Sequence, residues 1–206
     1  MGTALHFATT LVYSRAMKDP VVQEGDPVLR KKAKPVAEKS MRSKTTQALI
    51  ARMKKVLAGE EYGVAIAAPQ VGASVQLFVV SGRVFMPEDA KEDAKRPDDK
   101  VFINPEIIRL SRARHEMSEG CLSVRGKYGT VVRHEKTSIR AMGEDGKPFT
   151  YNATGLLAHI FQHEIDHLNG ILYTDKTKKL TNDADREDLR ERFPSGGKPK
   201  NISSHE

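Results

Sequence analysis

The chain has 206 residues, with 34 Lys and Arg against 27 Asp and Glu, and a formal net charge of +7. This length suits one domain with a sizeable core, and 38% hydrophobic with 30% charged residues excludes wholesale disorder. No apolar run approaches the roughly 18 residues of a membrane-spanning helix, and the single cysteine, Cys121, excludes an intrachain disulfide.

Residues 1–18 (MGTALHFATTLVYSRAMK) contain two basic residues and no acidic one. Two interpretations stay open: a transit peptide, or an extension that precedes a true start at Met17. The basic leader of a secretory signal is missing. We therefore expect a cytoplasmic protein, or one of an organelle matrix if residues 1–18 are a transit peptide.

The first periodic segment, residues 43–57, predicts an amphipathic helix because its apolar residues recur at three- and four-residue steps. Residues 87–100 (PEDAKEDAKRPDDK) are rich in charge and proline and predict one long surface loop. Glu-Asp-Gly at 144–146 is a tight-turn sequence and predicts a hairpin between the strands on either side. The predicted strands are residues 75–80, 101–104, 130–133, 137–142 and 148–152.

A second helix is predicted at residues 154–169. Thr154 is its candidate N-cap, and Gly170 stands where a left-handed residue ends a helix. One early helix, several strands and a late helix indicate an α+β fold in a single domain, with mixed, mostly antiparallel sheets packed around the late helix.

The late helix carries His-Glu-Ile-Asp-His at residues 163–167. His163 and His167 stand one turn apart on a single face, where both imidazoles can hold one metal ion, and Glu164 is beside them as a base for water. His159 lies one turn earlier. Because eight residues of helix span about 12 Å, one ion cannot take all three imidazoles, so we expect His159 to pack or to line a pocket.

The metal needs a third protein ligand. The pattern HExxHxxGxxH would place a histidine where this chain has Tyr173, although Gly170 is in register. A different protease architecture could use an acid such as Asp175 or Glu187. We favour Cys121, in the segment EGCLS, because a thiolate with two imidazoles is an acceptable tetrahedral set that leaves one position open.

A third cluster, GVAIAAPQVG at residues 63–72, is rich in small side chains that let backbone pack closely. It lacks the spacing of a phosphate loop or of a dinucleotide fingerprint. Gln70 could supply a neutral amide donor beside a metal, as oxyanion holes do.

Together these segments resemble the peptide deformylase family, which carries three motifs in the same order. Here they stand as GVAIAAPQ (63–70), EGCLS (119–123) and QHEIDH (162–167). EGDPVLRKKA (24–33) is similar to the family's N-terminal segment, and INPEI (103–107) to its central strand. The resemblance covers residues 21–175.

The resemblance implies hydrolysis of the formyl group from the N-terminal formyl-methionine of new polypeptides. It also implies a deformylase catalytic domain at residues 19–180, between an extension at 1–18 and a partly disordered tail at 181–206. Carried over by matching position, the metal ligands are Cys121, His163 and His167. The family's native ion is Fe²⁺, and Zn²⁺, Ni²⁺ or Co²⁺ can also occupy the site.

The same resemblance implies the other site residues. Glu164 matches the acid/base, and Gln70 with the backbone N–H of Leu122 matches the groups that stabilise the oxyanion. The backbone of Gly63, Val64 and Ala65 would pair with the substrate peptide as an added strand. The positions at or near the wall of the methionine pocket are Leu156, His159 and Ile160.

Two positions depart from the family pattern. Ala65 replaces the usual second glycine, which is harmless if φ is negative but adds a methyl group where substrate backbone passes. Arg125 follows EGCLSV where the family often has proline, and is expected to alter recognition beyond the methionine.

Three other classes stay open on the residues alone. An HExxH metallopeptidase would use an acidic third ligand, and a Cys–His hydrolase would use Cys121 as its nucleophile. Basic clusters at 30–34, 52–55 and 176–179 raise nucleic-acid binding, but no pattern for reading bases accompanies them. The expected partners are formyl-Met nascent polypeptides and, through this charge, the ribosome surface, with no sequence-specific nucleic acid, no membrane, and a monomeric state.

Overall fold

The structure is a computed structural model that describes residues 20–87, 89–91 and 93–182; the expected N-terminal extension and most of the expected C-terminal tail lie outside these residues. Within them the chain forms two α-helices, α1 (Lys44–Gly59) and α2 (Gly155–Leu168), and eight strands in two sheets. Neither helix combines the length and the apolar content that crossing a bilayer requires.

The larger sheet has five strands in the order β1-β2-β3-β6-β7, and every neighbouring pair is antiparallel. β1 therefore lies at one edge of this sheet. Its strands are β1 (Ala65–Ala67), β2 (Leu77–Val80), β3 (Lys100–Leu110), β6 (Lys136–Met142) and β7 (Pro148–Thr154).

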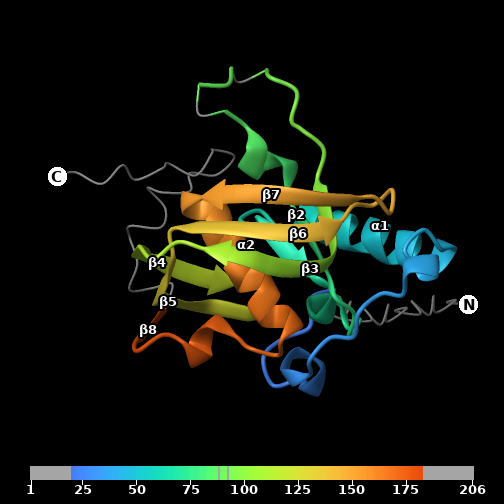
Figure 1. Cartoon of the computed structure of the whole chain (residues 1–206). Helices are drawn as coiled ribbons and strands as arrows, with labels where there is room; N and C mark the ends of the chain where they lie inside the picture. Colours follow the sequence, from blue (N-terminus) through green and yellow to red (C-terminus); the bar gives the residue numbers. More distant parts are fainter. Residues whose placement is uncertain (1–19, 88, 92, 183–206) are drawn as a thin grey trace, which may run out of the picture.

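The smaller sheet has three antiparallel strands in the order β4-β5-β8. They are β4 (Arg114–Cys121), β5 (Val124–His134) and β8 (Leu180–Asn182), the last ending two residues beyond the expected end of the catalytic domain at residue 180. α2 runs across the five-stranded sheet and also contacts β5, so it lies where the two sheets meet (Figure 1). The short 3-10 helices are η1 (Pro27–Arg30), η2 (Glu38–Ser40), η3 (Ala68–Val71), η4 (Gly82–Phe85) and η5 (Tyr173–Asp175).

β1 and β2 are buried on both faces because they lie between the two helices. Ile66 and Leu77 pack in the core that α1 closes with Ile50, whereas Phe78 packs in the core that α2 closes with Phe161. Alternate residues of a strand point to opposite faces, which explains why β2 (LFVV) is a continuous apolar run.

The predicted helices are confirmed to within two residues at each end. The Ser43 side chain accepts a hydrogen bond from the Thr46 N–H and so caps α1. Thr154 is the N-cap of α2, but its side chain makes no capping hydrogen bond. Gly170 has φ +74°, and a Cβ there would lie 2.5 Å from the Arg30 carbonyl oxygen, so both conformation and space require glycine.

The five predicted strands and the hairpin at Met142–Pro148 are confirmed, but β3 and β5 run several residues further than predicted. Three strands were not predicted. β1 and β8 have three residues each, which is too short for a recognisable strand pattern, and β4 (RHEMSEGC) is polar, so it lacks an apolar alternation.

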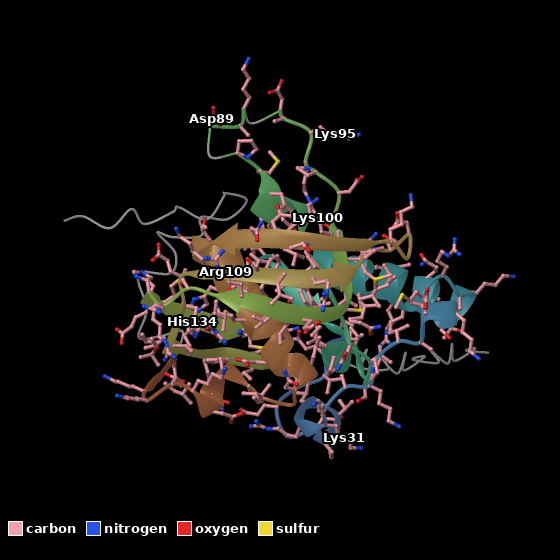
Figure 2. All side chains as sticks on the ribbon, viewed as in Figure 1. Lys31, Asp89, Lys95, Lys100, Arg109 and His134 are labelled. Carbon is pink, nitrogen blue, oxygen red and sulfur yellow. The ribbon has the colours of Figure 1, made fainter. Side chains whose placement is uncertain are left out.

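The segment after η4 forms the expected surface loop, and Figure 2 shows Asp89 and Lys95 on it, well away from the sheets. Its base is closely packed. A Cβ on Gly82 would lie 1.7 Å from the Pro97 carbonyl oxygen, and the Gly82 N–H donates to Asp99 Oδ1 at 2.8 Å. Glycine at position 82 therefore lets the two stems of the loop meet.

Candidate active site

The central face of α2 presents the two predicted imidazoles together. His163 and His167 are one turn apart, with ring centroids 4.9 Å from one another and ring planes at 74°. His167 is buried and His163 is partly buried. Burial lowers the pKa of His167 well below its ordinary value, so this imidazole is neutral and has a lone pair for a metal.

Cys121 lies beside these two histidines and comes from the three-stranded sheet. It ends β4 at the tight turn into β5, where it pairs with Val124. Its Sγ lies 3.1 Å from His167 Nε2, and one ligand atom from each of Cys121, His163 and His167 falls within 4.8 Å of the others. Among the described residues, this is the one group of three such side chains that could hold a metal ion.

The donor set fits a divalent transition metal. A tetrahedral site built on bonds of roughly 2.1 Å to nitrogen and 2.3 Å to sulfur has edges near the spacing of these atoms. His163 Nδ1 lies 2.7 Å from Glu119 Oε2, which fixes its proton there and leaves Nε2 as the ring atom for a metal. A thiolate and two imidazoles suit Fe²⁺, Zn²⁺, Ni²⁺ and Co²⁺ alike.

Tyr173, at the place of a third histidine, stacks on the His163 ring with centroids 6.3 Å apart, and its hydroxyl donates to the Lys127 carbonyl at 2.8 Å. The alternative acidic ligands are Asp175 and Glu187. The Asp175 carboxylate pairs with Arg30 and accepts the Leu172 N–H, and it does not belong to the ligand cluster. Glu187 lies outside the described residues.

A buried polar network orients His163. Glu119 accepts two N–H groups of Arg133, whose Nη1 also donates to Asp166 Oδ2 at 2.7 Å. Burial alone would raise the pKa of Glu119, but its contacts with Arg133, His159 and His163 outweigh burial and lower the pKa, so the carboxylate stays ionised. Burial likewise opposes protonation of His163, yet contacts with Cys121 and Glu119 raise its pKa well above the ordinary value.

Sequence reasoning missed Glu119 and Arg133. Glu119 stands two residues before Cys121 in the same strand, so both side chains point to one face of β4. This alternation could have placed Glu119 beside the ligand. The Arg133 partner could not be found in this way, because it comes from β5 across the hairpin.

Glu164 lies next to the ligand cluster in a dry environment. Its side chain is 3% exposed, and its Oε2 has no hydrogen-bond partner among the described residues. Burial raises the pKa of Glu164 to about 7, so the carboxyl group can take up and release a proton near neutrality.

The Gln70 amide is fixed and directed at the sulfur. Gln70 is 1% exposed, and its Oε1 accepts the Ala67 N–H at 2.8 Å. This bond orients the Nε2 donor, which lies 3.4 Å from Cys121 Sγ and 3.2 Å from Ser123 Oγ. Leu122 stands between these two residues in the β4–β5 turn, directly after Cys121.

The expected substrate-binding backbone lies at the open edge of the larger sheet. Gly63 and Val64 lead into β1, and the Val64 carbonyl accepts the Ser81 N–H at 2.8 Å. Ala65 is the first residue of β1, and its methyl group packs in the core that α2 closes. Its φ is not positive, so alanine is unstrained there.

The expected methionine-pocket residues all lie on α2. Leu156 and Ile160 pack in the same core cluster as Phe161. His159 is buried, and its Nε2 lies 2.5 Å from Glu119 Oε1 at an angle that makes no hydrogen bond. Burial lowers the pKa of His159. His159 does not belong to the ligand cluster, as the helix geometry predicts.

Comparison with known proteins agrees with this geometry. The polypeptide deformylase family model matches residues 18–183. The peptide deformylase of Halothermothrix orenii is 44% identical over 156 residues, which are 76% of this chain and 91% of that protein. The peptide deformylase of Carboxydothermus hydrogenoformans is 39% identical over 163 residues, or 78% of this chain and 93% of that protein.

Solved structures give the same result for the fold. The class I type b peptide deformylase of Acinetobacter baumannii with bound Met-Ala-Ser has a TM-score of 0.67 at 34% identity, covering 76% of this chain and 96% of that one. The actinonin complex of the Synechococcus elongatus peptide deformylase has a TM-score of 0.65 at 33% identity, covering 86% of this chain and 87% of that one. The chain therefore belongs to the polypeptide deformylase family, metal-dependent hydrolases that remove the formyl group from N-terminal formyl-methionine.

Proposed function

We propose that Cys121, His163 and His167 bind the metal of this deformylase and that Glu164 is its general acid/base. The observation that carries the proposal is the convergence of three ligand atoms within 4.8 Å beside a buried carboxyl group. We further propose Fe²⁺ as the native ion, with Zn²⁺, Ni²⁺ or Co²⁺ able to replace it, because this donor set accepts all four.

The chain's own residues account for the proton transfers. A bound divalent ion supplies Lewis acidity, which brings the pKa of water toward neutrality. Glu164 accepts the proton of the attacking water, since its raised pKa and its free oxygen suit that step. It then returns the proton to the departing amine of methionine. Glu119 and Arg133 hold His163 in one tautomer throughout.

Two donors stabilise the charge that develops on the formyl oxygen. The Gln70 amide is preorganised by its bond to the Ala67 N–H, and the Leu122 N–H comes from the adjacent turn. Removing one such donor typically costs about 10²–10³ in rate. These roles follow from position and from the chemistry of acyl transfer.

The proposed peptide site is the edge of β1. Gly63, Val64 and Ala65 would add the substrate as a further strand, since a sheet edge carries unpaired backbone groups. The deformylase of A. baumannii binds Met-Ala-Ser, a peptide of the kind that this edge would accept. Leu156, His159 and Ile160 are proposed to form the methionine-pocket wall.

The proposed partners are formyl-Met nascent polypeptides. The domain would comprise residues 19–180 and act as a monomer in the cytoplasm, or in an organelle matrix if residues 1–18 are a transit peptide. Contact with the ribosome surface would use the excess positive charge. The basic clusters are partly neutralised by ion pairs, with Arg30 bound to Asp175 and Lys54 to Glu144, which argues against specific nucleic-acid binding.

The deciding experiment measures formate release from formyl-Met-Ala-Ser by the wild type and by Glu164→Ala, with metal analysis of both. We expect the substitution to lower kcat by about 10²–10⁴ while metal content stays the same. The wild-type kcat/KM should also fall on the acid side, where the Glu164 carboxyl becomes protonated. Because a bound cation lowers the pKa of a neighbouring acid, this limb should lie at or below about pH 7.

Cys121→Ala provides the matched test of the ligand set. It should lose metal together with activity, whereas an acid-liganded peptidase would keep its metal. A covalent adduct of Cys121 with substrate would favour a Cys–His hydrolase. If iron-loaded wild type, handled without oxygen, released no formate, the proposal would be wrong.

A further inference from the structure

We propose that the ion pair between Glu60 and Arg125 positions the peptide-binding segment 63–65 relative to the β4–β5 turn, and thereby sets the affinity for substrate residues beyond formyl-methionine. The inference rests on the proposed function, since it concerns the edge of β1 as the peptide site. Arg125 also stands at the position where the family often has proline, which cannot form such an ion pair.

The ion pair has two hydrogen bonds. Arg125 Nη2 donates to Glu60 Oε1 at 2.8 Å, and Arg125 Nη1 donates to Glu60 Oε2 at 3.1 Å. Such a fork-to-fork contact fixes the relative orientation of two planar groups as well as their distance. It joins residues that are 65 positions apart in the sequence.

Glu60 controls the turn that leads into segment 63–65. It is the C-cap of α1, and its carbonyl accepts the Gly63 N–H at 3.1 Å. A Cβ on Gly63 would lie 2.8 Å from Glu60 Cβ, so the Glu60 side chain packs directly on the Gly63 backbone. Any displacement of Glu60 is therefore passed to Gly63.

Arg83 holds the same turn from another side. Its Nη1 donates to the Glu61 carbonyl at 2.6 Å, and its Nη2 donates to the Glu60 carbonyl at 3.4 Å. Two arginines thus restrain the turn; Arg83 links it to η4, and Arg125 links it to the smaller sheet. Without Arg125 the turn would keep its link to η4 and lose its link to the β4–β5 turn.

Arg125 itself is well anchored. It follows Val124 at the start of β5, where Val124 pairs with Cys121, and Ser123 accepts the Gln70 amide. The β4–β5 hairpin that carries Arg125 therefore also carries the proposed metal ligand Cys121 and the proposed oxyanion donor Leu122. The ion pair thus sets the spacing between the reacting end of the substrate and the edge that would bind its peptide.

Because the ion pair is partly exposed to solvent, its effect on substrate binding can be measured separately from its effect on stability. The Arg125 side chain is 44% exposed and that of Glu60 16%. A partly exposed pair adds little to stability, so neutralising either residue should leave the fold and the metal site intact. An effect on catalysis that depends on substrate length would then report on geometry.

The test is a double-mutant cycle of Glu60→Gln and Arg125→Gln, together with the charge exchange Glu60→Arg/Arg125→Glu. Each variant is assayed on formyl-Met-Ala-Ser and on formyl-methionine amide, with melting temperature and metal content measured in parallel. We expect each single change to raise KM for the tripeptide about three- to fivefold, the range of a partly exposed ion pair, and to leave kcat within about twofold. KM for the amide should change by less than about twofold, and the charge exchange should restore the tripeptide KM.

A matched control uses the ion pair of Arg140 with Glu106, which joins β6 to β3 and is exposed on both sides. Glu106→Gln and Arg140→Gln should leave both KM values unchanged. Equal effects on the two substrates, a fall in kcat instead of a rise in KM, or no restoration by a folded charge-exchange variant would overturn the inference. Failure of the proposed function is distinct, since the wild type would then release no formate from either substrate.

Discussion

The two sheets that meet at α2 contact this helix through different kinds of side chain. The five-stranded sheet joins α2 through packed aromatic rings: Phe102 is stacked on Phe78 at 4.7 Å and meets Phe161 of α2 edge to face at 5.0 Å between ring centroids. The three-stranded sheet joins α2 through charge, because Arg133 of β5 binds Glu119 and Asp166. Burying an ion pair contributes little net stability, whereas burying apolar rings contributes much. The larger sheet therefore stabilises α2, and the smaller one orients its side chains.

The largest effect is expected from disrupting the apolar contact between the five-stranded sheet and α2. Phe102 is fully buried and contacts rings from β2, β7 and α2. Phe102→Ala should lower the free energy of unfolding by about 3–5 kcal/mol, measured by urea titration. The kcat of the molecules that remain folded should stay within about twofold at low temperature. A comparable loss of kcat would show that the apolar core also orients the site.

An intermediate effect is expected from disrupting the ion-pair network between the three-stranded sheet and α2. Glu119→Gln removes the charge that faces His163 and Arg133 while keeping the shape of the side chain. Metal affinity or activity should fall about 10- to 100-fold, because the proposed ligand His163 loses its orienting partner. Metal titration followed by the formate assay measures this.

Glu106→Gln, in the exposed pair with Arg140, is the matched control for Glu119→Gln. It should cost less than about 1 kcal/mol of stability and leave metal affinity unchanged. If the two substitutions behaved alike, the buried network would have no special part in holding the metal site.

The smallest expected effect concerns Ala65 of β1, a strand that contributes both to the apolar core and to the proposed peptide site. The Ala65 methyl group faces the core that α2 closes, whereas the open edge of β1 lies in the plane of the sheet. Ala65→Gly should therefore lower stability by about 0.5–1 kcal/mol and change the tripeptide KM by less than about twofold. A clear drop in KM would show that the methyl group obstructs the peptide.

Much of this site could be predicted because its chemistry is encoded locally. His163, Glu164 and His167 lie within one helical turn, and Thr154 and Gly170 bracket that helix. A motif within one helix can be predicted correctly even when the order of the surrounding strands is not known. The sequence also favoured Cys121 as the third ligand, since Tyr173 occupies the place of a third histidine.

The remainder depends on pairings that no local pattern records. Strand β4 is polar because its side chains form the Glu119 network and the ligand, so an apolar alternation could not reveal it. The contact of Arg133 with Glu119 requires the register of a hairpin, and that of Arg125 with Glu60 requires two sheets to be placed side by side. Ion pairs across elements depend on strand register and on how the two sheets are placed, and local sequence patterns do not record either of these.

The packing of Gly82 against Pro97 has a practical consequence for engineering. The stems of the loop are held together at that point, and the tip near Asp89 and Lys95 lies beyond this contact, away from the sheets (Figure 2). Foreign epitopes or fluorescent labels grafted onto the tip would leave the catalytic centre undisturbed, provided that the glycine beneath is kept.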